Sequence, residues 1–84
     1  MATVEERVIA VTARVLKMDP QRIKATDNFA TDLGAESVQS IELVASFEEE
    51  FGIEMDEDAA LAVESVGAAT AFIAQVCREQ GVAL

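Results

Sequence analysis

The sequence contains no histidine, tryptophan or tyrosine, and it has one cysteine and one proline in 84 residues. Without histidine, the chain has no imidazole to act as a general base or to ligate a metal ion. The single cysteine, Cys77, cannot form an internal disulfide bond, so the fold does not depend on oxidation. No apolar stretch approaches the roughly 20 residues of a membrane-spanning helix. We therefore expect no metal site, no internal disulfide and no membrane insertion.

Basic residues are scarce and unevenly distributed. Six Lys and Arg oppose sixteen Asp and Glu, which gives a net charge of −10. Five of the six basic residues lie in residues 1–24, and residues 25–84 carry a net charge of −12. So acidic a surface repels nucleic acid phosphates and anionic lipid head groups, and we expect it to bind neither. The first residues lack the basic end and apolar run of a secretory signal, so a cytoplasmic protein is expected.

Helical periodicity dominates the chain. Apolar residues recur at steps of three and four between residues 4 and 16, and Thr3 with Glu6 forms a capping-box pair at their start. Pro20 predicts that this helix ends near residue 18. Residues 19–35 are predicted to form a long loop, which is either functional or a connection tied to the core. Three apolar side chains are spaced to pin this loop: Ile23, Phe29 and Leu33.

Three further helices are predicted after the loop. The second runs from Ser37 to Phe51 and ends at Gly52, and a short acidic helix follows near Asp56–Ala62. Ser65 is predicted to cap the last helix. Its apolar stripe comprises Val66, Ala69, Ile73 and Val76. The pattern therefore predicts one all-α domain over residues 1–84, a small four-helix bundle with a long first loop and a short third helix.

The helix predicted at residues 37–51 has two apolar faces when its residues are spaced at about 100° each. The face assigned to the core comprises Ser40, Leu43, Val44, Phe47 and Phe51. The second face is a strip formed by Val38, Ile41 and Ala45, with Glu42, Glu48 and Glu49 at its edges. Either neighbouring helices cover this strip, or it is exposed and docks a basic partner.

Ser37 stands at the amino end of that helix, directly after Gly34-Ala35-Glu36. A serine there either caps the helix by accepting a backbone N–H bond or offers its hydroxyl for covalent attachment. The free N–H groups and positive dipole end of the first turn would favour a phosphate on that oxygen. No His or Lys lies within twelve residues on either side. Nothing nearby activates the hydroxyl, so another enzyme must modify it.

Several segments together resemble an acyl carrier protein. They are Asp32-Leu33-Gly34-Ala35-Glu36-Ser37-Val38, Ile41-Glu42-Leu43-Val44 and Phe47-Glu48-Glu49-Glu50-Phe51-Gly52-Ile53. The resemblance implies that Ser37 receives 4′-phosphopantetheine from coenzyme A through a phosphopantetheinyl transferase, the holo-carrier synthase. The arm would carry acyl groups as thioesters for fatty-acid, specialised-lipid or polyketide biosynthesis. The resemblance also implies that the second helix docks on basic patches of acyl-transferring and chain-elongating enzymes. We expect the carrier to be a monomer.

The expected docking residues are Glu36, Val38, Ile41, Glu42, Ala45, Glu48 and Glu49. The sequence departs from the family's usual Asp-Ser-Leu motif, because it reads Glu36-Ser37-Val38, and this favours a specialised carrier. The alternative hypothesis is an unmodified acidic interaction module that only binds basic partners. No catalytic residues are predicted, so an enzyme is not expected.

Two other features are interpreted as structural. Asp56-Glu57-Asp58 has the acid density of a calcium loop but lacks its glycine and closing glutamate, so it is assigned to a helix start. Cys77 lies on or beside the core stripe of the last helix and is expected to be a buried thiol.

Overall fold

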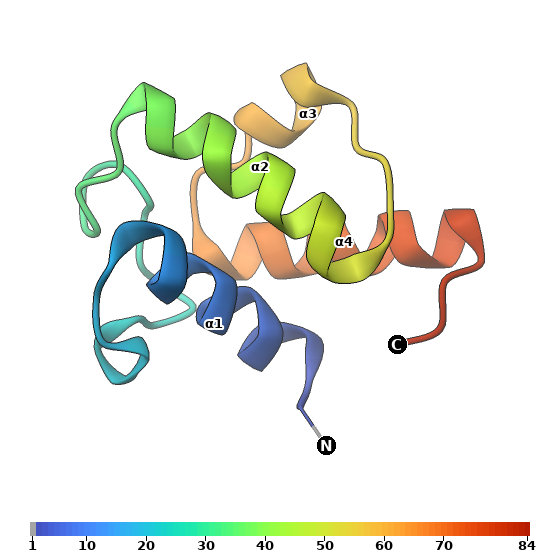
Figure 1. Ribbon diagram of the computed structural model, residues 1–84, viewed down its shortest axis with the longest axis horizontal. Helices are drawn as coiled ribbons and strands as arrows, with labels where there is room; N and C mark the ends of the chain where they lie inside the picture. The colour runs from blue at the N-terminus through green and yellow to red at the C-terminus, as the bar shows by residue number, and fades with distance from the viewer. Residues whose placement is uncertain (1) are drawn as a thin grey trace.

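The computed structural model describes residues 2–84, which form four α-helices and one short 3-10 helix. In chain order these are α1 (Val4–Leu16), η1 (Pro20–Arg22), α2 (Ser37–Phe51), α3 (Glu57–Leu61) and α4 (Val66–Gln80) (Figure 1). Apart from an isolated bridge between Asn28 and Ser65, this part of the chain contains no strand. No helix within residues 2–84 has both the length and the apolar composition of a membrane-spanning segment. The predicted all-α four-helix fold is confirmed.

Side-chain caps set the helix boundaries. At the start of α1 the Thr3 hydroxyl accepts from the Glu6 N–H at 3.1 Å, and the Glu6 carboxylate accepts from the Thr3 N–H at 2.9 Å. The Ser65 hydroxyl accepts from the Ala68 N–H at 3.1 Å and begins α4, as predicted. Gly52 ends α2 in the left-handed conformation, with φ of 66°. Local sequence therefore fixes where these helices start and stop.

The loop between α1 and α2 is more ordered than predicted. Pro20 begins the one-turn helix η1, and the Asp19 carboxylate caps it by accepting from the Gln21 N–H at 2.8 Å. Proline suits this position because its missing N–H would have no partner there. Ile23 and Phe29 are buried and Leu33 packs against the core, so the pinning role expected of these three side chains is confirmed.

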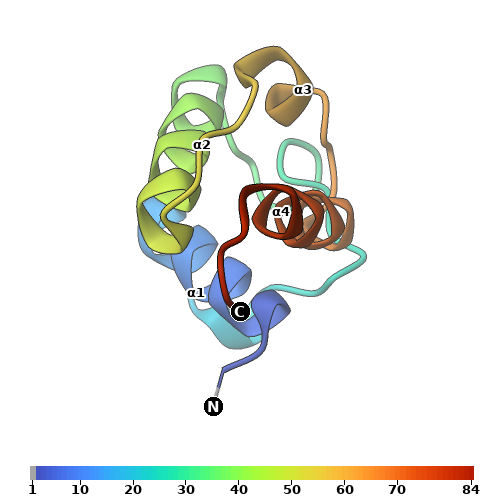
Figure 2. The same cartoon turned by 90° about the vertical axis from the view of Figure 1, so that its right-hand side faces the viewer.

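The three long helices enclose the core, and α3 lies across the space between α2 and α4 (Figure 2). Helices α1 and α2 run antiparallel, because the start of α1 meets the end of α2 through the Arg7–Glu50 ion pair of 3.1 Å. All four stripe residues predicted on α4 are buried, and so is Cys77. The core face predicted for α2 is confirmed at Leu43, Phe47 and Phe51, which are buried, while Ser40 and Val44 are half-buried.

Candidate functional site

Ser37 is the first residue of α2, and its side chain is exposed. The interpretation of Ser37 as the helix cap is wrong, because Glu36 takes the cap position with extended backbone angles. The Glu36 N–H donates to the Gln39 side chain at 2.9 Å. Within residues 2–84, the Ser37 hydroxyl has no hydrogen-bond partner. The hydroxyl is therefore free for chemistry at the positive end of a fifteen-residue helix.

The loop that delivers Ser37 is fixed by its own hydrogen bonds. The Asn28 side-chain oxygen accepts from the N–H groups of Ala30 and Thr31, at 3.0 and 3.1 Å. The Asp32 carboxylate accepts from the Asn28 N–H at 2.7 Å. Gly34 then turns the chain with φ of +72°, a conformation that other residues rarely adopt. The space around this glycine is open, since a Cβ built on it meets nothing within 4 Å.

The same loop is bound to the start of α4. Phe29 N–H donates to the Glu64 carbonyl at 2.9 Å, and Val66 N–H donates to the Asp27 carbonyl at 2.9 Å. Gly67 N–H donates to the Ala25 carbonyl at 2.8 Å. A Cβ on Gly67 would lie 3.0 Å from that carbonyl oxygen, a tight contact, so this close approach favours glycine. These bonds connect the region before Ser37 to residues at the start of α4 that lie 35 to 42 positions further along the chain.

The second apolar strip of α2 is exposed. Val38 and Ile41 are 66% and 52% exposed, although apolar side chains of this size usually pack inside a protein. Ala45, Glu36, Glu42 and Glu49 are also exposed. The hypothesis that neighbouring helices cover the strip is therefore wrong. The helix instead presents an apolar strip with carboxylates beside it, the composition expected of a docking face.

Glu48 differs from the other predicted docking residues. It is half-buried, and its carboxylate accepts a hydrogen bond from the Met55 N–H at 2.9 Å. This bond fastens the segment between α2 and α3 to the last turns of α2. Glu48 therefore has a structural role that the helical wheel did not indicate.

A cavity of about 350 Å³ opens between α2, α3, α4 and the loop before α2. Its lining is mostly apolar and includes Leu43, Phe47, Leu61, Phe72 and Ile73. Ala60 of α3 also lines it, whereas Ala59 and Ala62 are exposed. An apolar cavity of this kind can shelter a flexible hydrocarbon chain from water.

The two features assigned to structure have the expected roles. The Asp56 carboxylate caps α3 by accepting from the N–H groups of Asp58 and Ala59, at 2.9 and 3.3 Å. In residues 2–84 no group of three or more His, Cys, Asp or Glu side chains is arranged so that it could hold a metal ion. Cys77 is fully buried, and desolvation by this burial raises the pKa of its thiol.

Sequence reasoning missed Asn28 and Met55, and it assigned Leu43, Phe47 and Ile73 to the core without the cavity that they line. Asn28 had a local signal, because asparagine readily hydrogen-bonds the backbone two residues on and initiates turns. Met55 and Phe72 gave no such signal. They meet the cavity only when α2, α3 and α4 pack together.

The fold and site define a small four-helix protein, whose exposed serine begins a helix that also bears an exposed apolar strip. A family model described as a phosphopantetheine attachment site matches residues 6–73. The chain is 42% identical to an acyl carrier protein of Afipia carboxidovorans, over 87% of this chain and 92% of that protein. It is 41% identical to one of Caulobacter vibrioides, over 89% and 96%, and 44% identical to one of Phenylobacterium zucineum, over 87% and 92%.

The chain belongs to the acyl carrier protein family. It is therefore a carrier rather than an enzyme, and its cofactor is phosphopantetheine. This decides against the alternative of an unmodified interaction module. The family also implies interaction with a phosphopantetheinyl transferase and with biosynthetic enzymes.

The residues at the start of α2 fit a phosphopantetheine group. An exposed hydroxyl is available at Ser37, and the first backbone N–H groups of α2 have no carbonyl partner within the helix. Such N–H groups and the helix dipole stabilise a phosphodiester anion. When bound, the group supplies a terminal thiol that holds an acyl group as a thioester.

Proposed function

We propose that this protein carries aliphatic acyl groups as thioesters on a 4′-phosphopantetheine arm esterified to Ser37. The observation that carries the proposal is the Ser37 hydroxyl, which is exposed, forms no hydrogen bond with any residue from 2 to 84 and belongs to the first residue of α2. The matched family region, residues 6–73, includes this serine. With no His in the chain and no Lys near Ser37, attachment depends on a separate transferase.

The docking surface for that transferase and for acyl-transferring enzymes is the exposed strip of α2. Val38, Ile41 and Ala45 supply apolar contacts, and Glu36, Glu42 and Glu49 supply negative charge around them. A basic patch on the partner complements this arrangement. Glu48 contributes charge at one edge while its carboxylate holds Met55.

The cavity supports an aliphatic cargo. Its apolar lining stabilises a hydrocarbon chain, because burial removes apolar surface from water. The Glu36-Ser37-Val38 motif favours a specialised lipid or polyketide pathway over housekeeping fatty-acid synthesis. Glu36 is longer than the usual aspartate, and Val38 is smaller and β-branched compared with the usual leucine.

Intact mass spectrometry after incubation with coenzyme A and a broad-specificity phosphopantetheinyl transferase tests the proposal. We expect the wild-type chain to gain the mass of one phosphopantetheine group and Ser37→Ala to gain none. Ser40→Ala is the matched control, because Ser40 lies one turn further along α2 and should not affect loading. Loading of Ser37→Ala, or an unloaded wild-type chain, would overturn the proposal.

A further inference from the structure

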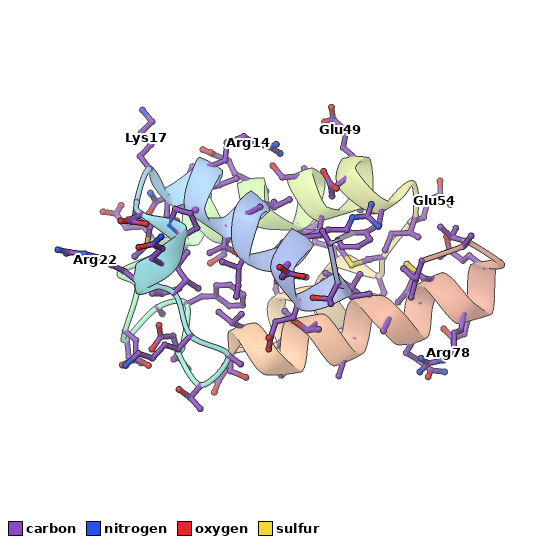
Figure 3. The ribbon with its side chains drawn as sticks, turned by 90° about the horizontal axis from the view of Figure 1, so that it is seen from below. Arg14, Lys17, Arg22, Glu49, Glu54 and Arg78 are labelled. Atoms are coloured by element: carbon purple, nitrogen blue, oxygen red, sulfur yellow. The ribbon has the colours of Figure 1, made fainter. Side chains whose placement is uncertain are left out.

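The face of the molecule that presents the α2 strip also presents positive charge from α1. Two basic residues at the end of α1 are exposed: Arg14 in its last turn and Lys17, the residue that follows the helix. Figure 3 shows both side chains pointing to the same side of the molecule as Glu49 of α2, whereas Arg78 of α4 points to the opposite side. The docking face is therefore not uniformly acidic.

Helix geometry places Arg14 nearer to the amino end of α2 than Arg7 is. Arg7 lies over the Phe51 ring, 4.3 Å from its centroid, and pairs with Glu50, which sets the register of the two antiparallel helices. Arg14 lies seven residues after Arg7 and hence on the same side of α1, about 10 Å further along. Because α1 and α2 run antiparallel, a residue further along α1 lies beside an earlier residue of α2. Arg14 therefore lies nearer than Arg7 to the amino end of α2, where Ser37 and the exposed strip lie.

Arg7 and Arg14 differ in what their charges meet. The Arg7 guanidinium donates to the Glu50 carboxylate at 3.1 Å and to the Glu50 backbone carbonyl at 3.0 Å. Neither Arg14 nor Lys17 forms an ion pair with any residue of the described range 2–84. Their charges remain available to a partner.

Lys17 also occupies a backbone position that favours glycine. It caps the end of α1 in the left-handed conformation with φ of 56°. At the corresponding positions, α2 and α4 end in glycines, Gly52 and Gly81. A lysine is strained there relative to glycine. The chain thus carries a positive charge at a position where a neutral glycine would suit the backbone better, which points to a use for that charge.

We infer that Arg14 and Lys17 are specificity-determining contacts for the phosphopantetheinyl transferase that loads Ser37, and that its basic docking patch is bordered by carboxylates facing them. This inference rests on the proposed carrier function. A transferase must approach the amino end of α2, and the carboxyl end of α1 lies at the same end of the antiparallel pair (Figure 1). A patch that is basic throughout would meet Arg14 and Lys17 with like charge, which is unfavourable. A transferase whose basic patch is bordered by carboxylates would pair these two cations and would therefore bind this carrier in preference.

The steady-state kinetics of Ser37 loading test this inference. The probe is the phosphopantetheinyl transferase of the organism that makes this chain, with coenzyme A and product measured by intact mass. We expect Arg14→Glu and Lys17→Glu each to raise KM for the carrier about fivefold, with kcat unchanged. Arg78→Glu is the matched control, because it makes the same change in net charge on the far side. It should change KM less than about twofold.

Two further variants separate docking from folding. Lys17→Gly relieves the backbone strain, so its melting temperature should equal or exceed that of the wild type while its KM rises. Replacing carboxylates at the edge of the transferase patch by Lys, one at a time, should restore loading of Arg14→Glu. The inference is overturned if the KM of both Arg14→Glu and Lys17→Glu is unchanged or lower, or if the KM of Arg78→Glu rises as much as theirs. In either case the loading of Ser37 itself still stands. A wild-type chain that is never loaded overturns the carrier function and this inference together.

Discussion

The Glu48 carboxylate accepts a hydrogen bond from the backbone N–H of Met55 at 2.9 Å, and this bond joins α2 to the wall of the cavity. Glu48→Ala leaves the partly buried Met55 N–H without its partner, so we expect a loss of about 1–2 kcal/mol in the free energy of unfolding. Urea denaturation measures this loss, and hydrogen exchange should show faster exchange of the Met55 amide.

Glu49→Ala is the control for that prediction, because Glu49 is the exposed neighbour of Glu48. It should change stability by less than about 0.5 kcal/mol and leave the Met55 amide protected. Equal stability losses in the two variants would contradict the structural role of Glu48.

Gly34 tests whether the loop before Ser37 depends on its left-handed turn. Gly34→Ala meets no neighbouring atom, so the cost arises from the positive φ alone, about 1–2 kcal/mol. Gly34→Asn should cost less, since asparagine tolerates this conformation better. Urea denaturation of both variants measures the difference. A Gly34→Ala chain as stable as the wild type would show that the turn can relax.

Cys77 provides a test of pH dependence. Burial raises the pKa of its thiol above the ordinary value of 9.0. The folded state therefore holds the proton more tightly than the unfolded state does. This stabilisation is complete below the unfolded pKa and is lost as pH rises through the folded pKa. The urea midpoint of the wild type should fall more steeply than that of Cys77→Ala as the pH rises above the ordinary thiol pKa of 9.0. Parallel curves for the two proteins would contradict the buried thiol.

The acidity of residues 25–84 predicts a dependence of stability on salt. Thirteen acidic residues oppose one basic residue there, so self-repulsion destabilises the compact state at low ionic strength. We expect the melting temperature to rise when sodium chloride increases from about 10 mM to about 200 mM, and also when magnesium is added. A melting temperature that does not move with ionic strength would argue against this repulsion.

Features with local causes could be predicted from the sequence. Thr3 with Glu6, Ser65 and Gly52 mark helix ends through contacts within a few residues, and the structure confirms each of them. The two faces of α2 follow from helical periodicity, which correctly separates buried Phe47 from exposed Ile41.

Features that depend on distant contacts could not be predicted. The bond from Phe29 N–H to the Glu64 carbonyl, the fastening of Met55 by Glu48 and the cavity all require the packed arrangement of α2, α3 and α4. The predicted bounds of the second helix, Ser37 to Phe51, are confirmed, but the interpretation of Ser37 as its cap is wrong. Serine is a frequent cap, yet here Glu36 has the extended backbone of the cap and Ser37 begins the helix.

The central claim concerns the Ser37 hydroxyl as the attachment point of the arm. Its most direct test is peptide mapping by tandem mass spectrometry of the protein purified from the cells that produce it. The account predicts that the phosphopantetheine mass is found on the peptide containing Ser37 and that fragmentation assigns it to that residue. The arm on another residue, or its absence from every preparation, would contradict the account.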